Sequence, residues 1–281
     1  MSGILLVVAT PIGNLADLTP RAADALRRAN LVLAEDTRRT RGLLAHLGIH
    51  TPLESFDAHR ERGGSARVVE RIRAGQTVAL VTDAGTPGLS DPGGLLVRAV
   101  RAAGLPVSPL PRPSAAAAAV SVAGLDDGRF RFEGFLPRKG SERERRLATI
   151  RDADVAVVFF ESPQRLGRTL RDLADVAGKE REAIVCRELT KLHEEIASGT
   201  LESLAVRFAD DVLGELTIVL LPDPSRADRQ AGPAAPDPAA LAARLRDEDL
   251  APSRVARILE DVCDLGHNEA YRIAHGKPPQ P

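Results

Sequence analysis

The chain has 281 residues, enough for about two domains, and its composition of 43% hydrophobic and 27% charged residues is ordinary for a globular protein. The formal net charge is -1, so non-specific electrostatics cannot drive nucleic-acid binding, which would need a local basic face. The two cysteines, Cys186 and Cys263, lie far apart in unlike contexts and form neither a disulfide framework nor a zinc motif. No apolar stretch is long enough to span a bilayer, and no charged segment precedes Ile4. We therefore expect a cytoplasmic protein with no membrane partner and no metal.

Three apolar runs in the first part of the chain predict strands, at residues 3–9, 31–34 and 77–82. Each run is followed by a loop rich in glycine, proline or charged residues. Continuous apolar runs are typical of strands buried on both faces in a parallel sheet. In such a sheet ligands bind beyond the carboxyl ends of the strands, so we expect the three loops to share one edge.

The loop after the third run contains four glycines between residues 85 and 94, which let a ligand approach the backbone closely. An ordinary crossover loop is the alternative. A helix is expected next, with Asp91 as its N-cap and Pro92 at its first position.

The remaining elements of the first half are placed by caps and periodicity. We expect residues 55–62 to form a loop and residues 107–110 a short strand. Helices are predicted at 20–29 (capped by Thr19), 41–47, 65–74, 95–103 and 115–122 (capped by Ser114). The proline-rich segment before Ser114 indicates a domain junction.

The second half repeats the alternation of helices and strands. Strands are predicted at 129–135, 155–160, 183–187 and 214–221, and helices at 141–151, 166–177 and 201–209. Residues 223–238 are predicted to form a linker rich in proline and alanine, and 239–281 a small helical appendage. The appendage is interpreted either as a helix-turn-helix module or as a tail packed on the main body. The domains are therefore expected at 1–113 and 114–222.

Several catalytic motifs are absent. The sequence has no dinucleotide fingerprint, no P-loop, no nucleophile elbow and no zinc-protease helix, and His193 lacks a second histidine at the required spacing. What remains is a cleft between two α/β halves, lined by small, glycine-rich loops at strand ends. Such a cleft suits an uncharged or zwitterionic nucleoside-like ligand held by backbone groups.

Eight segments resemble the motifs of the ribosomal RNA small subunit methyltransferase I family, of tetrapyrrole methylase fold. They are TPIGNL (10–15), AEDTR (34–38), VTDAGTP (81–87), SDPG (90–93), EGFLPRK (133–139), FFESP (159–163), RELTK (187–191) and GE (214–215). They occur in the family's order and cover roughly residues 4–221, and the helical appendage is similar to one that this family often carries. The resemblance implies two α/β domains with a cleft for S-adenosylmethionine between them, and a homodimer.

The resemblance also implies the reaction and the cofactor site. The expected activity is 2'-O-methylation of a cytidine ribose in the decoding region of small-subunit rRNA, with free rRNA or the 30S subunit as partner. The cofactor-binding residues carried over from the motifs are Thr10, Pro11, Asp83, Ala84, Gly85, Thr86, Pro87, Leu89, Ser114, Ala115, Phe160, Leu189, Leu216 and Thr217.

Candidate catalytic carboxylates are Asp36 and Glu161, each of which would alternatively cap a helix or pin a loop. Candidate RNA-binding residues are basic, with a solvated helix face as the alternative for residues 143–146: Arg38, Arg39, Lys139, Arg143, Arg145, Arg146, Arg165 and Lys191. Phe130, Phe132 and Phe135 either stack on bases or pack in a core.

One position departs from the family pattern. The family has glycine within Pro-Leu-Pro-Gly-Pro-Ser, where this chain has Arg112. We hypothesise that Arg112 points out of the cleft and contacts an RNA phosphate, which unchanged rRNA affinity in an Arg112→Gly variant would contradict. The alternatives to an rRNA methyltransferase are a small-molecule methylase of the same fold, such as a tetrapyrrole methylase, and a non-catalytic RNA-binding or ribosome-assembly protein.

Overall fold

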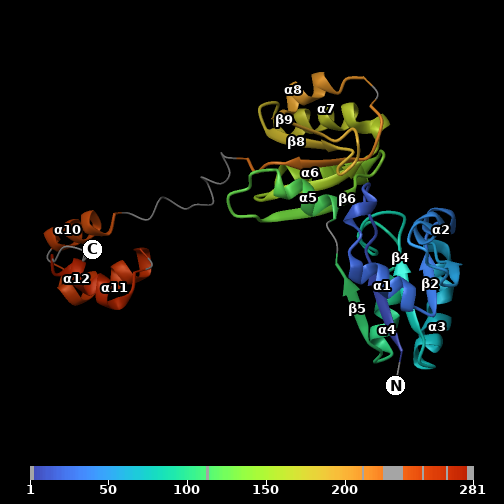
Figure 1. The fold of residues 1–281 in the computed structure, drawn as a ribbon. Coiled ribbons are helices and arrows are strands. Elements are labelled where there is room, and N and C mark those ends of the chain that lie inside the picture. The colour runs from blue at the N-terminus through green and yellow to red at the C-terminus, as the bar shows by residue number, and fades with distance from the viewer. Residues whose placement is uncertain are drawn as a thin grey trace. The chain divides into compact units, whose positions relative to one another are not determined.

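A computed structural model describes residues 3–111, 114–210, 212–223, 237–248, 250–263 and 265–276. Contacts divide the chain into two compact units, Met1–Pro222 and Asp223–Pro281 (Figure 1). The first unit contains two five-stranded sheets. The unit has the predicted mixture of strands and helices.

The first sheet has the strand order β3-β2-β4-β1-β5, and every neighbouring pair is parallel. Its strands are β1 (Ile4–Val8), β2 (Leu31–Ala34), β3 (Leu53–Ser55), β4 (Thr77–Val81) and β5 (Val107–Leu110). The three apolar runs are confirmed as β1, β2 and β4, and parallel pairing places their carboxyl ends at one edge. The short β3 was not predicted, because Leu53 is the only apolar residue in it.

Helices cover both faces of this sheet (Figure 1). They are α1 (Pro20–Arg28), α2 (Thr37–His46), α3 (Ala58–Arg73) and α4 (Gly94–Ala102). Alternate residues of each strand point to opposite faces, so Leu31 and Leu33 pack with α3 and α4, whereas Val32 and Ala34 pack with α1 and α2. Burial on both faces explains why these strands are continuously apolar.

Three predicted boundaries in this half were wrong. Residues 55–62 are not a loop, because α3 begins at Ala58, where Asp57 accepts hydrogen bonds from the first turn. Helix α2 begins at Thr37 rather than at residue 41. Helix α4 begins at Gly94 and not at Pro92, because Gly93 has a φ of 135°, which is incompatible with a helix, and Asp91 is not its cap.

The second sheet has the order β6-β7-β10-β8-β9. Its strands are β6 (Phe130–Phe135), β7 (Ala156–Glu161), β8 (Glu182–Arg187), β9 (Glu195–Thr200) and β10 (Leu216–Leu220). Only β6 and β7 are parallel, and the other pairs are antiparallel. The second half is therefore not a simple repeat of the first. Strand β9 was not predicted, because it lies at the edge of the sheet and its mostly polar residues lack the apolar run typical of a buried strand.

Helices pack on both faces of the second sheet as well. They are α5 (Ala115–Ser121), α6 (Ser141–Arg151), α7 (Leu166–Ala177) and α8 (Leu201–Arg207), with short 3-10 turns η1 (Leu15–Asp17) and η2 (Pro163–Arg165). The predicted bounds of α6 and α7 are confirmed. Ser114 accepts a hydrogen bond from the Ala117 N–H at 3.1 Å and caps α5, as predicted.

The second unit has a hydrophobic core of its own. Three helices are described in it, α10 (Pro238–Asp247), α11 (Pro252–Cys263) and α12 (His267–Ala274). Val255 and Leu259 of α11 and Ala270 of α12 are fully buried in this core. The predicted linker lies mostly outside the described residues, and the helix-turn-helix interpretation stays a prediction. Among the residues that the structure describes, no helix is long and apolar enough to cross a membrane.

Candidate active site

The loops after β1 and β4 are joined by their backbones. The Thr10 N–H donates to the Gly85 carbonyl at 2.8 Å, and the Gly85 N–H donates to the Thr10 carbonyl at 3.1 Å. The buried Thr10 hydroxyl donates to the Thr82 carbonyl at 3.0 Å. Gly85 has a φ of 80°, which a side chain would disfavour. These bonds hold the two loops together at the carboxyl edge of the sheet.

The loop after β1 also touches the second half of the unit. A Cβ atom on Gly13 would lie 2.5 Å from Cγ of Lys191 and 2.7 Å from the Thr190 hydroxyl, so only glycine fits. The Asn14 N–H donates to the same hydroxyl at 3.1 Å. Glu188 and Thr190 have positive φ values of 52° and 68°, which mark a tightly constrained loop. The two halves are thus in direct contact beside the strand-end loops.

A cavity of about 450 Å³ opens between these loops and the second sheet. Ten of the predicted cofactor-binding residues line it: Asp83, Ala84, Gly85, Thr86, Leu89, Ser114, Ala115, Phe160, Leu216 and Thr217. They come from both halves of the unit, as the resemblance implied. Ligand binding by these residues stays a prediction.

An adjoining hollow of about 330 Å³ shares Ile12, Arg39, Asp83, Ala84 and Glu215 with the cavity. The predicted residues Thr10 and Pro11 line this hollow. Pro87 and Leu189 line neither space: Pro87 is buried, and Leu189 packs against the core beneath α5.

Nine cavity residues were not among the predicted site residues. They are Ile12, Glu35, Ser90, Asp91, Phe135, Ser162, Pro163, Gly214 and Glu215. Every one of them lies within one of the eight family-like segments, so the segments themselves were the available signal. They were not predicted because only some residues of each segment were chosen as site residues.

Carboxylates at the strand ends make one side of the cavity acidic. Burial is the main cause that raises the pKa of Glu35, and the negative charge of Asp83 adds to it. Burial likewise raises the pKa of Asp91 to about 6, with a contribution from Glu35. A neutral or cationic ligand group therefore suits this side of the cavity better than an anion.

Asp36 occupies a structural position. Its Oδ1 accepts from the Arg38 N–H at 2.8 Å and caps α2, which is the alternative role considered from the sequence. The Arg38 guanidinium, 2.7 Å from Oδ2, is the main cause that lowers the pKa of Asp36 to about 2. So acidic a group has little tendency to take up a proton near neutral pH.

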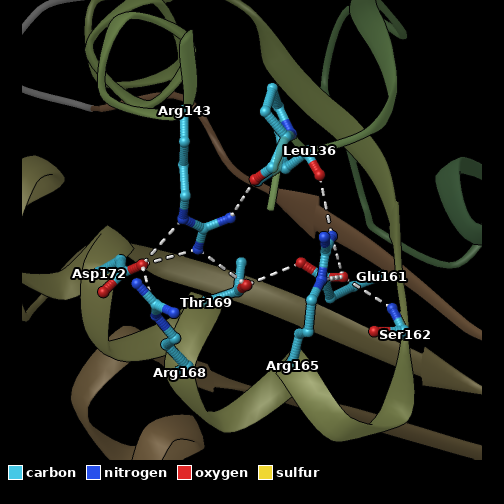
Figure 2. A network of polar contacts seen from close by, with 9 residues as sticks. Leu136, Arg143, Glu161, Ser162, Arg165, Arg168, Thr169 and Asp172 are labelled. Carbon is cyan, nitrogen blue, oxygen red and sulfur yellow. Dashed lines mark hydrogen bonds and ion pairs between the residues drawn. The ribbon is translucent and has the colours of Figure 1, made fainter. Parts of the chain in front are cut away.

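Glu161 lies at the centre of a polar network at the end of β7 (Figure 2). It is buried and accepts from the Ser162 N–H at 2.7 Å, from Nε of Arg165 at 2.5 Å and from the Thr169 hydroxyl at 2.7 Å. Thr169 in turn accepts from Arg143, which donates to Asp172. The network fixes Ser162 in the cavity wall, so Glu161 pins a loop.

The predicted RNA-binding residues differ in their surroundings. Arg143 and Arg165 are largely buried in the network of Figure 2, and Arg146 pairs with Glu133. Lys191 lies between Glu188 and Glu215, at 2.8 and 3.2 Å. The exposed members are Arg38, Arg39, Lys139 and Arg145. Of these four, only Arg39 lines the cavity, where its Nε lies 3.6 Å from Asp83.

Aromatic side chains form the opposite wall. Phe160 packs against Phe132 at 4.9 Å and against Phe135 at 5.5 Å between ring centroids. Phe132 belongs to the core beneath α5, whereas Phe135 is exposed and lines the cavity. Arg112 and its hypothesised phosphate contact lie outside the described residues. In the described part of the chain, no group of three or more His, Cys, Asp or Glu side chains is placed to hold a metal ion.

The sequence of the unit that holds the cavity matches a known class of methylases. A family model described as Tetrapyrrole (Corrin/Porphyrin) Methylases matches residues 5–205, and the chain belongs to that family. The fold is shared with uroporphyrin-III C-methyl transferase from Thermus thermophilus, solved in complex with S-adenyl homocysteine. That likeness has a TM-score of 0.56 and 20% identity, over 77% of this chain and 96% of the other.

Curated relatives identify the branch of the family. The chain is 45% identical to ribosomal RNA small subunit methyltransferase I of Xylella fastidiosa (strain Temecula1 / ATCC 700964), over 96% of this chain and 98% of that protein. It is 44% identical to the protein of the same name from Thermotoga maritima, over 78% of this chain and 98% of that protein. The chain therefore belongs to the ribosomal RNA small subunit methyltransferase I family and is a methyltransferase.

Proposed function

We propose that this methyltransferase uses S-adenosylmethionine to methylate the 2'-oxygen of a cytidine ribose in the decoding region of small-subunit rRNA. The observation that carries the proposal is the cavity lined by residues of seven of the eight family-like segments, from both halves. The names of the curated relatives support small-subunit rRNA as the substrate.

The cavity fits the proposed methyl donor. Its volume of about 450 Å³ is in the range of small-molecule sites. Phe135 and Phe160 offer an apolar wall for a nucleobase, and the backbone near Gly85 offers polar groups without bulk. Glu35, Asp83 and Asp91 suit a positively charged centre. The donor, when bound, supplies a methyl group activated by attachment to sulfonium sulfur.

The residues of this chain would act mainly by holding the reactants in place. Correct orientation of two reactants lowers the activation free energy by roughly 7–11 kcal/mol, without any covalent intermediate. Loops joined by backbone hydrogen bonds, as at Thr10 and Gly85, lose little entropy on binding. We therefore assign the strand-end loops to donor binding and orientation.

The exposed basic residues near the cavity are assigned to RNA. Arg39 lines the cavity and Arg38 precedes it on α2, which supports a role for both in contacts with RNA. Phosphate contacts predict that rRNA affinity falls with salt, by a log–log slope of about -0.7 per contact for single strands. We further propose that the protein is cytoplasmic and forms a homodimer. Light scattering tests the oligomeric state.

Methyl transfer to purified 30S subunits tests the proposed function. Radiolabelled S-adenosylmethionine is supplied, and the label is mapped by nuclease digestion. We expect label on one ribose 2'-oxygen in the decoding region. Absence of label on both subunits and free rRNA, with donor binding intact, would instead favour a small-molecule methylase.

A further inference from the structure

Three carboxylates from the first sheet line the cavity, Glu35, Asp83 and Asp91. A backbone group of Asp83 lowers the pKa of Glu35, against the larger effect of burial. Oδ1 of Asp83 accepts from the Asp36 N–H at 3.0 Å, and Oδ2 lies 3.6 Å from Nε of Arg39. Asp91 is the third of these carboxylates, and no ion pair is formed by it in the described part of the chain.

The carboxylates from the second sheet are also paired. Glu161 is bound by Arg165, Thr169 and the Ser162 N–H. Glu215 pairs with Lys191. Among the carboxylates that line the cavity in the described part of the chain, Glu35 and Asp91 make no ion pair and no hydrogen bond of standard geometry, and of these two only Asp91 has a side-chain hydroxyl, that of Thr82, as its hydrogen-bonding neighbour.

The loop that carries Asp91 is rigidly held. Its start and end are joined by a hydrogen bond from the Gly88 N–H to the Pro92 carbonyl at 3.2 Å. Ser90 has a φ of 67°, a strained conformation for a residue other than glycine. A Cβ atom on Gly134 of β6 would lie 2.9 Å from the Ser90 hydroxyl, so the loop also touches the second sheet. Asp91 is thus fixed at the junction of the two halves.

The neighbouring Thr82 side chain adds an independent observation. Thr82 is 1% exposed, and its hydroxyl makes no hydrogen bond of standard geometry among the described residues. The hydroxyl lies near Asp91 and partly offsets the rise in its pKa. The buried Thr82 hydroxyl and the half-buried Asp91 carboxylate thus retain hydrogen-bonding capacity at the cavity, which a catalytic role would explain.

The proposed reaction requires a proton acceptor. The ribose 2'-oxygen forms a bond to the methyl carbon while the carbon–sulfur bond breaks and its electron pair goes to sulfur. One positive charge disappears at sulfur, and the hydroxyl proton must leave the oxygen. A carboxylate beside the reacting atoms can take up that proton at the moment the neighbouring positive charge is lost.

We propose that the Asp91 carboxylate accepts the proton of the ribose 2'-hydroxyl during methyl transfer, an inference that rests on the function proposed above. The other charged groups that line the cavity set the properties of Asp91. Glu35 and Asp83 favour its protonated form, Arg39 lies 3.6 Å from Asp83, and Glu161 and Glu215 are paired with their own partners.

The pKa of Asp91 supports this role. Raised to about 6, it lies close to neutral pH, where a general base is most effective. A sulfonium cation nearby would lower that pKa and keep the carboxylate ionised before the reaction. Once the sulfur is neutral the pKa rises again, so the affinity of Asp91 for the proton increases as the methyl group moves.

Calorimetry of donor binding tests the assignment without turnover. At about pH 6, binding of S-adenosylmethionine to the wild-type protein should release up to about 0.5 proton per site, because half of the Asp91 groups are then protonated. Binding of S-adenosylhomocysteine, whose sulfur is neutral, should release much less. The Asp91→Asn variant should show no difference between the two ligands. Equal proton release by the wild-type and variant proteins would overturn the proposal.

Single-turnover methyl transfer to 30S subunits provides the second readout. Asp91→Asn should slow the transfer by about 10²–10⁴-fold and remove the acidic limb of the pH–rate profile. Its rRNA affinity should stay within about threefold of wild type, a change of less than 1 kcal/mol. Its affinity for S-adenosylmethionine should fall, because the carboxylate that faces the sulfonium charge is lost, whereas its affinity for S-adenosylhomocysteine should not. Asp91→Glu should recover part of the rate, and Asp126→Asn, in an exposed turn, is the matched control.

Failure of the Asp91 assignment and failure of the proposed function give different experimental results. A rate for Asp91→Asn within about threefold of wild type, with the acidic limb retained, would contradict the assignment. A variant whose only defect is weak donor binding would show that Asp91 is a binding residue and would also contradict it. Absence of methyl transfer by the wild-type protein contradicts the proposed function, whereas the calorimetric result does not depend on RNA.

Discussion

At the scale of single residues, the carboxylates in and beside the site have different roles. Glu161 accepts hydrogen bonds from three neighbouring groups, and Asp36 caps helix α2. Asp91 is half-buried close to other negative charges. The first two were selected from the sequence because each follows a predicted strand. Neither their partners nor the surroundings of Asp91 can be read from strand ends alone.

Asp91 should reduce the stability of the ligand-free protein at neutral pH. Its pKa is raised from 3.8 to about 6, so the folded state binds the proton more tightly than the unfolded state. Stability is therefore lost as the pH rises from about 4 to about 6. Asp91→Asn should be more stable than wild type at about pH 7, by about 1 kcal/mol after allowance for solvent screening, and equal to it below about pH 4. Urea unfolding across this range measures the difference, and a gap that does not change with pH would contradict it.

Removing Glu161 should destabilise the second half of the unit. Glu161→Ala leaves Arg165 and Thr169 without their buried partner, which costs about 3–5 kcal/mol. The urea midpoint should fall accordingly, while Glu180→Ala, at an exposed position, should change stability by less than about 0.5 kcal/mol. Normal stability combined with lost turnover would instead support the catalytic role predicted for Glu161.

At the scale of elements, helix α4 shows how a distant residue replaces a local cap. One carboxylate oxygen of Glu61, on α3, accepts from the N–H groups of Gly93, Leu95 and Leu96 at 3.0, 2.7 and 3.1 Å. The negative charge also opposes the positive end of the helix dipole. The residue that caps α4 thus comes from a different helix, and Asp91 is left available for the cavity.

Glu61→Ala should destabilise the protein by about 1–3 kcal/mol, because it leaves buried N–H groups without acceptors. Since the Asp91 loop leads directly into α4, donor binding should weaken as well. Glu61→Gln keeps an acceptor oxygen and should lose less, and Glu70→Ala on the exposed face of α3 is the control. Thermal unfolding and donor titration provide the measurements. Unchanged stability of Glu61→Ala would show that water replaces the cap.

The same scale shows which features sequence patterns could predict. Helices α6 and α7 were predicted with their bounds because their limits are marked by local residues. The central strands were predicted because burial on both faces makes them apolar throughout. Strands β3 and β9 were missed because they depend on neighbouring strands more than on their own residues. The cavity was located from its loops, but its acidic side depends on contacts between distant residues.

At the scale of the whole molecule, the two units have separate hydrophobic cores. The alignment with the Thermotoga maritima relative covers 98% of that protein but only 78% of this chain. The part of this chain outside that alignment is about as long as the second unit. The candidate active site is built from residues of the first unit alone.

A chain shortened to residues 1–223 should fold and bind the methyl donor with an affinity within about 0.5 kcal/mol of the full chain, because the first unit has its own hydrophobic core and supplies every residue that lines the cavity. Donor titration and thermal unfolding of both forms measure this. Reduced methyl transfer to 30S subunits with donor affinity retained would assign RNA binding to the second unit. Loss of donor binding would mean that the first unit depends on the second.

The position of β1 has a consequence for biosynthesis. Strand β1 (Ile4–Val8) pairs with β4 and β5, both of which lie much later in the chain. Ribosomes add about 5–20 residues per second, so the roughly 70 residues between β1 and β4 take roughly 4–14 s to synthesise. During that time an apolar segment has neither of its partner strands. We expect the nascent chain to need a chaperone over this interval, and slow translation of the first half to increase its aggregation.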